Sequence, residues 1–183
     1  MIKGLHHNVY RCRDSEENRR FYEDFLGLPL VRSFRASRTA TGREVNLLHT
    51  TYALGENSFL EFFEVPGQPF EFKEQHDFDL HIAFEIDPET QNRLRETARA
   101  EGREVRGLSD HGPIHSLYLR DPSGYVIELA APKPGAERRA DPAANRARAI
   151  LDDWQATKPV RPDMDTTEEP EPDKPIDRAS NGS

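Results

Sequence analysis

Hydrophobic and polar residues alternate in several short stretches of residues 1–132, and two stretches between them have helical periodicity. The order is a strand, a helix and three more strands, and the same order then repeats. In the first expected helix, DSEENRRFYEDFLG, Asp14 or Ser15 can cap the N-terminus. In the second, Asp87 can cap the helix and Pro88 occupies its first position. We therefore predict two βαβββ units.

The expected strands are short and bounded by turn residues. Those of the first unit are LHHNVYRCR, LPLVRSFRAS, EVNLLHTTYAL and SFLEFFEVPG, and those of the second are DLHIAFEI, REVRGL, IHSLYLRD and GYVIELAA. This pattern predicts an α+β fold. Two such units can pair their sheets into one curved, open barrel with the helices outside.

The composition changes after residue 132, so we separate a domain of residues 1–132 from a linker with an amphipathic helix (133–157) and a tail (158–183). The helix is expected at 141–156 and to pack on the domain or on a partner subunit. Its apolar face would consist of Ala143, Ala147, Ile150, Leu151 and Trp154. The tail is rich in proline and acidic residues, so we expect it to be disordered.

Charge and composition exclude several classes of partner. The net charge of −8 argues against non-specific binding to nucleic acid, which needs a basic surface. No apolar run approaches the roughly 18 residues of a membrane span, and the N-terminus has no apolar signal region. Cys12 is the only cysteine, so an intramolecular disulfide is impossible. We expect a cytoplasmic protein that acts on a small molecule.

Strand alternation predicts which side chains point into the barrel. In LHIAFEI, Ile82, Phe84 and Ile86 form an apolar face for the helix, so His81 points to the other side. In the last strand the same reasoning turns Glu128 inward, between two apolar neighbours. A buried carboxylate costs several kcal/mol unless it is paired or coordinated. We therefore expect a partner for this carboxylate inside the barrel.

Each unit has a histidine on its first strand and a glutamate on its last strand. In the first unit these are Glu61 and one of the adjacent His6 and His7, between which alternation does not choose. Two histidines and one carboxylate match a divalent metal site. The structural alternative is that Glu128 pairs with a buried arginine such as Arg120. The recurrence at equivalent strand positions favours the metal site.

Four stretches of the sequence resemble the vicinal oxygen chelate superfamily. They are LHHNVYRCRDSEENRRFYEDFLGL, FLEFFEVPG, LHIAFEI and HSLYLRDPSGYVIEL. This superfamily includes glyoxalase I, extradiol dioxygenases, fosfomycin-resistance enzymes and bleomycin-binding proteins. Its first-strand ligand lies seven residues before the aspartate that opens the helix, so the resemblance selects His7, seven before Asp14. It likewise implies His81 and Glu128 as metal ligands, and it covers nearly all of residues 1–132.

The last two strands are similar to the signature of extradiol ring-cleaving dioxygenases. The matching residues are His111, Leu117, Tyr118, the DPSG turn and Glu128, whereas Ser109 and the presence of one paired unit depart from the usual pattern. The resemblance implies Fe(II), with three open positions for a catecholate and O₂. It assigns proton transfer to His111 and a hydrogen bond to substrate to Tyr118. His115 is a candidate further contact.

Two alternatives have different chemistry. If Glu61 also binds the metal, the site resembles glyoxalase I, in which Ni, Zn or Mn polarises an enediolate and a glutamate acts as the base. The other alternative is a non-catalytic protein that binds an antibiotic or other small molecule. We favour the dioxygenase, with an aromatic or carbonyl compound as substrate class. The paired units can assemble within one chain or between two, so a homodimer is possible.

Overall fold

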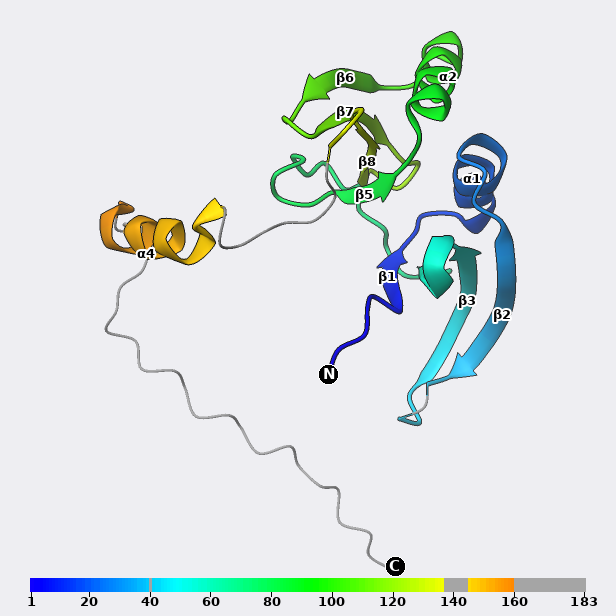
Figure 1. Cartoon of the computed structure of the whole chain (residues 1–183). Helices are drawn as coiled ribbons and strands as arrows, with labels where there is room; N and C mark the ends of the chain where they lie inside the picture. Colours follow the sequence, from blue (N-terminus) through cyan, green and yellow to red (C-terminus); the bar gives the residue numbers. More distant parts are fainter. Residues whose placement is uncertain (40, 137–144, 160–183) are drawn as a thin grey trace, which may run out of the picture. The chain divides into compact units, whose positions relative to one another are not determined.

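The computed structural model describes residues 1–39, 41–136 and 145–159 (Figure 1). The chain forms two compact units, residues 1–138 and 139–183. In the described part of the chain, no helix is long and apolar enough to cross a membrane.

The first unit contains both predicted repeats, each with the order strand, helix and three strands. The first repeat consists of β1 (His7–Arg11), α1 (Ser15–Arg19), η1 (Arg20–Phe25), β2 (Leu30–Arg38), β3 (Glu44–Ala53), η2 (Gly55–Asn57) and β4 (Phe59–Glu64). The second consists of β5 (Ile82–Glu85), α2 (Pro88–Ala100), β6 (Val105–Asp110), β7 (Ile114–Arg120) and β8 (Val126–Pro132). The predicted α+β class is confirmed.

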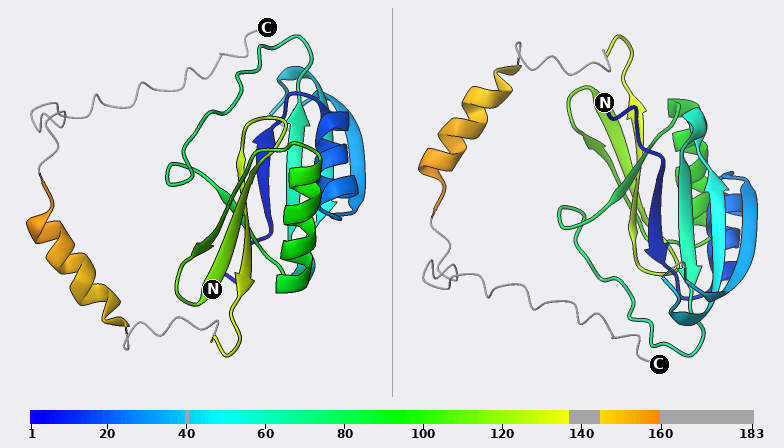
Figure 2. Two further views of the ribbon diagram at one scale, coloured as in Figure 1. Left: turned by 90° about the horizontal axis from the view of Figure 1, so that it is seen from above. Right: turned by 90° about the horizontal axis from the view of Figure 1, so that it is seen from below.

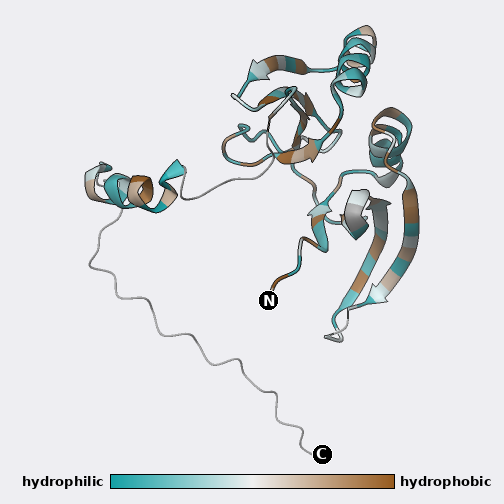
Figure 3. Ribbon diagram, viewed as in Figure 1, coloured by the Kyte–Doolittle hydropathy of each residue, from teal (hydrophilic) through white to brown (hydrophobic). Residues whose placement is uncertain are grey.

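The strands form two separate mixed sheets, which we call the N-sheet (β1-β4-β3-β2) and the C-sheet (β5-β8-β7-β6). In each sheet the first and last strands of the repeat pair in parallel, and the other neighbours are antiparallel. Bands of hydrophobic and hydrophilic residues follow one another along β2 (Figure 3). In the described residues the two sheets share no strand pairing, so these strands do not close a barrel.

Both predicted helix caps are present. The Asp14 carboxylate accepts hydrogen bonds from the backbone N–H groups of Glu16 and Glu17. Asp87 accepts one from the N–H of Thr90, with proline at the start of α2 as expected. These contacts satisfy N–H groups that have no partner within a helix. The first helix differs from the prediction because it continues from α1 into the π-helical segment η1.

The hydrophobic core combines residues of both repeats, and α1 and α2 lie side by side (Figure 1, Figure 2). The fully buried side chains with the largest volume include Tyr22, Tyr52, Phe21, Phe62, Leu60, Leu94, Leu117, Ile127 and Leu129. Arg103 stacks on the ring of Phe25 across the repeats, with its guanidinium carbon 4.5 Å from the ring centroid. Since the apolar side of each sheet contributes to this core, the other side carries the polar candidate residues. We call that other side the open face.

In the second unit, the described helix is α4 (Ala147–Thr157), which overlaps the later part of the helix predicted at 141–156. Its apolar residues Ile150, Leu151 and Trp154 are exposed. Residues 141–144, including Ala143, and most of the predicted tail lie outside the described residues.

Candidate metal centre

His81 and Glu128 meet on the open face of the C-sheet. His81 immediately precedes β5, and Ala83, which follows it on the same face, is the parallel neighbour of Glu128 on β8. His81 Nε2 lies 3.1 Å from Glu128 Oε2, and the two side chains are 39% and 8% exposed. The predicted inward direction of these two side chains agrees with this arrangement.

In each of these two side chains, the polar atom that does not face the other side chain has a hydrogen-bond partner of its own. His81 Nδ1 bonds to the backbone carbonyl oxygen of Asp77, which can only accept, so we assign the proton to Nδ1. Ser116 Oγ donates to Glu128 Oε1. With the proton of a neutral imidazole on Nδ1, the lone pair of Nε2 would point at the remaining carboxylate oxygen, and a proton or a cation would be required between the two atoms.

The distance between these two atoms fits two neighbouring ligands of one metal ion. Two ligand atoms at about 2.1–2.2 Å from an octahedral ion, at a right angle to each other, are about 3.0 Å apart. The donor set, imidazole nitrogen with carboxylate oxygen, suits first-row divalent ions. The alternative pairing of Glu128 with Arg120 is wrong, because Arg120 Nε donates to Glu104 Oε2 at 3.1 Å and its Nη1 contacts backbone carbonyls.

His7 and Glu61 form a second pair, on the open face of the N-sheet. His7 Nε2 lies 4.0 Å from Glu61 Oε2, and His7 Nδ1 lies 2.7 Å from His6 Nδ1. Glu61 Oε2 also lies 2.9 Å from His49 Nε2, and Thr51 donates to its Oε1 at 3.3 Å. Both oxygens of Glu61 thus have protein partners.

His49 was missed by the sequence reasoning, although alternation offered a signal. It lies opposite Phe63 in the pairing of β3 with β4, two residues along β4 from Glu61. The same-face spacing in both strands would have brought the imidazole and the carboxylate together if the register had been known. The rings of Phe34 and Phe63 contact the His49 ring edge-to-face, at centroid distances of 4.8 and 4.5 Å.

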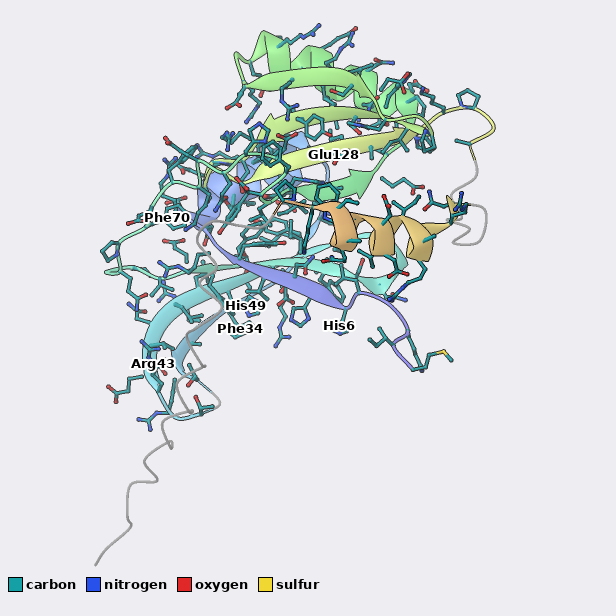
Figure 4. All side chains as sticks on the ribbon, turned by 90° about the vertical axis from the view of Figure 1, so that its left-hand side faces the viewer. His6, Phe34, Arg43, His49, Phe70 and Glu128 are labelled. Carbon is teal, nitrogen blue, oxygen red and sulfur yellow. The ribbon has the colours of Figure 1, made fainter. Side chains whose placement is uncertain are left out.

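The four predicted metal ligands occur as two pairs on different sheets. Figure 4 shows Glu128 on the C-sheet, His49 on the N-sheet and His6 immediately before β1. Within residues 1–39, 41–136 and 145–159, no three His, Cys, Asp or Glu side chains converge where they could hold one ion. The expected meeting of His7 with His81 and Glu128 therefore does not occur inside this chain, because the core joins the apolar sides of the sheets.

His111 and Tyr118 lie together beside the His81–Glu128 pair. His111 Nε2 is 3.0 Å from the Tyr118 hydroxyl. Tyr118 is the direct cross-strand neighbour of Glu128, so both side chains share the open face. Burial, and after it the negative charge of Glu128, raises the pKa of Tyr118. The hydroxyl keeps its proton at neutral pH and is available as a hydrogen-bond donor.

His115 does not join this group. It lies three residues from Tyr118 on β7, and an odd separation puts the two side chains on opposite faces of the strand. Its Nε2 is 3.9 Å from Asp110 Oδ2 near the end of the β6–β7 hairpin.

Comparisons with known proteins agree with this architecture. Residues 4–129 match the family model described as Glyoxalase/Bleomycin resistance protein/Dioxygenase superfamily. A comparison with curated protein sequences gave no match.

Solved structures of similar fold include fosfomycin resistance protein FosX from Mesorhizobium loti, with 22% identity, a TM-score of 0.53, and coverage of 73% of this chain and 94% of that one. A mutant of FosX from Listeria monocytogenes, complexed with Mn(II) and 1S,2S-dihydroxypropylphosphonic acid, has 20% identity, a TM-score of 0.55, and coverage of 76% and 100%. A glyoxalase/dioxygenase from Nostoc punctiforme has 20% identity, a TM-score of 0.54, and coverage of 72% and 92%.

At these identities the similarity extends to the fold alone, whereas the family model covers more than half of the sequence. The chain belongs to the Glyoxalase/Bleomycin resistance protein/Dioxygenase superfamily.

Proposed function

We propose that this protein is an Fe(II)-dependent extradiol-type dioxygenase that cleaves the ring of a small catechol-like substrate. The observation that carries the proposal is the pair of His81 Nε2 and Glu128 Oε2, 3.1 Å apart, each held by a hydrogen bond to its other polar atom. A buried carboxylate without an arginine partner is unfavourable unless a cation joins it. A divalent ion between the two atoms would account for their separation and would balance the charge of the buried carboxylate.

We further propose that His7 of a second copy supplies the third ligand. His7 lies exposed on the open face of the N-sheet, and His6 engages its Nδ1. The same face carries the exposed apolar residues Val9 and Phe34, which a partner sheet would cover. Pairing the N-sheet of one copy with the C-sheet of another would create two equivalent sites in a homodimer.

Each carboxylate has one imidazole and one hydroxyl partner, since Glu61 contacts His49 and Thr51 and Glu128 contacts His81 and Ser116. The choice of three protein ligands over four follows the resemblance of the last two strands to extradiol dioxygenases. Three ligands on an octahedral ion leave three positions, enough for both oxygens of a catechol and for O₂. This favours dioxygenase chemistry over the four-ligand lyase.

The protein's own residues then have separate tasks. Fe(II), when bound, supplies the redox chemistry and binds the vicinal oxygens of the substrate. Tyr118, the cross-strand neighbour of Glu128, donates a hydrogen bond from its hydroxyl to a substrate oxygen. His111, 3.0 Å from that hydroxyl, accepts a proton from the substrate hydroxyl and returns it to the ring-opened product.

The test is anaerobic reconstitution with Fe(II), followed by a panel of catechols and O₂. We expect oxygen uptake and a yellow ring-opened product that contains both atoms of the consumed O₂. Glu128→Gln should lose Fe(II) binding and activity, whereas Glu61→Gln is the matched control and should keep the Fe(II) affinity.

Other results would contradict the proposal in distinct ways. Turnover of a hemithioacetal with Ni(II) or Zn(II), combined with loss of metal affinity in Glu61→Gln, would assign lyase chemistry. Binding of a small molecule with no divalent ion bound would indicate the non-catalytic alternative.

A further inference from the structure

Arg106 lies between the two residue pairs of the C-sheet, His81 with Glu128 and His111 with Tyr118. It lies on β6 directly opposite Tyr118 on β7, and its guanidinium carbon is 4.2 Å from the centroid of the tyrosine ring. Its Nη2 donates to Asp77 Oδ2 at 2.7 Å. Asp77 belongs to the irregular segment before β5 that leads to His81. One side chain therefore contacts both the ring beside Glu128 and the segment that carries a candidate ligand.

The backbone of Asp77 determines which nitrogen of His81 is protonated. Its carbonyl oxygen is the acceptor for His81 Nδ1. A tight turn brings this carbonyl into reach, because the N–H groups of Asp79 and Leu80 both donate to the carbonyl of His76. If the turn moves, Nδ1 loses its acceptor, and the proton can transfer to Nε2, where Glu128 accepts it.

The segment is fixed to the C-sheet farther from His81 as well. Arg120 Nη1 donates to the carbonyls of Lys73 and Gln75, and the N–H of Lys73 donates to the carbonyl of Ser123. These contacts hold Lys73 and Gln75, which precede the turn of residues 76–80. The ion pair between Asp77 and Arg106 holds the turn itself.

We propose that Arg106 is a positioning residue for the metal centre. Through Asp77 it holds the turn whose carbonyl keeps the His81 proton on Nδ1, so that Nε2 is free for a metal ion. The consequence for metal affinity rests on the proposed function, whereas the consequence for the tautomer of His81 does not.

The sizes of the expected changes in stability and in metal affinity distinguish a positioning role from a purely structural one. The side chains of Arg106 and Asp77 are 55% and 18% exposed, and an ion pair this accessible to solvent adds little to stability. Loss of a group that orients a histidine ligand typically lowers metal affinity about 10–100-fold. A positioning role thus predicts a large change in metal affinity with an almost unchanged unfolding transition.

The test uses the full chain with Arg106→Gln and, separately, Asp77→Asn, which keeps the backbone carbonyl. Long-range ¹H–¹⁵N NMR of the metal-free protein at alkaline pH reads the tautomer of His81. We expect the Nδ1–H form in the wild type and a substantial Nε2–H fraction in both variants. Mn(II) affinity, followed by electron paramagnetic resonance, should fall about 10–100-fold in both variants.

Two controls define the outcome. Glu17→Gln breaks the pair of Glu17 with Arg13, which has an N–O distance of 2.6 Å and a similarly exposed arginine, and should change neither reading. Arg106→Lys keeps one charged donor and should restore most of the Nδ1–H form. An unchanged His81 tautomer in Arg106→Gln and Asp77→Asn would overturn the inference. If the wild type binds no Mn(II), the proposed function fails, and the tautomer reading still decides the role of Arg106.

Discussion

The two repeats are joined by a buried hydrogen bond whose strength should depend on pH. Tyr22 in η1 donates to Asp121 Oδ2 at 2.8 Å, across 99 residues of sequence. Burial raises the pKa of Asp121 from its ordinary value of 3.8 to about 6, although hydrogen bonds from Tyr22 and from backbone N–H groups oppose the shift. At about 1.4 kcal/mol per pKa unit, ionising this group in the folded protein costs about 3 kcal/mol.

The sign follows from the raised pKa. The folded state favours the protonated acid, so the contribution of Asp121 to stability is fully present below about pH 4 and is lost as the pH rises through about 6. A hydrogen bond to an ionised carboxylate contributes about 1.5–3 kcal/mol, against about 1 kcal/mol for a neutral one. Tyr22→Phe should therefore destabilise the protein by about 1 kcal/mol at pH 4 and by about 2–3 kcal/mol at pH 7.5.

Urea unfolding followed by circular dichroism measures this difference at both pH values. The control is the same substitution in an Asp121→Asn background, where the effect of Tyr22→Phe should no longer depend on pH. An equal loss of stability at both pH values in the otherwise wild-type protein would refute the reasoning.

Three further predictions concern the metal centre and the segment beside it. Ser116→Ala removes the donor to Glu128 and should weaken Mn(II) binding about 10-fold by calorimetry; an affinity equal to wild type would show that Ser116 does not orient the carboxylate. Gly124→Ala should lower thermal stability by at least about 1 kcal/mol, since this residue has a φ of +97° and an added Cβ would lie 2.4 Å from the backbone nitrogen of Lys73; a variant as stable as wild type would contradict that contact. Inactive His7→Ala and Glu128→Ala proteins, mixed and refolded together, should recover up to about a quarter of wild-type activity as one intact site forms per heterodimer; activity that stays at zero would argue against a shared site.

Local signals predicted most of the fold. Alternation assigned the strands and the direction of His81 and Glu128, because each strand buries one apolar face against a helix. Asp14 and Asp87 identified the helix starts, because a capping carboxylate satisfies N–H groups of the first turn wherever that helix lies. Alternation within IHSLYLRD also separates His115 from Tyr118, so naming His115 as a candidate further contact neglected a signal in the sequence.

The grouping of the ligands could not be read from the sequence. Strand order and the packing of the repeats decide that Glu128 meets His81 while Glu61 meets His49 and His7, and no local pattern encodes either. The contact of His81 with the carbonyl of Asp77 depends on an irregular turn and on a backbone atom, which leave no mark in a pattern of side chains.

We propose that a divalent ion lies between His81 Nε2 and Glu128 Oε2 and that His7 of a second copy completes its ligands. Anomalous diffraction from crystals grown with Mn(II) or, under anaerobic conditions, Fe(II) tests it directly. We predict one anomalous peak per chain, about 2.1–2.2 Å from both atoms and from a His7 imidazole of another copy. A metal-saturated crystal with no peak between His81 and Glu128 would contradict the account.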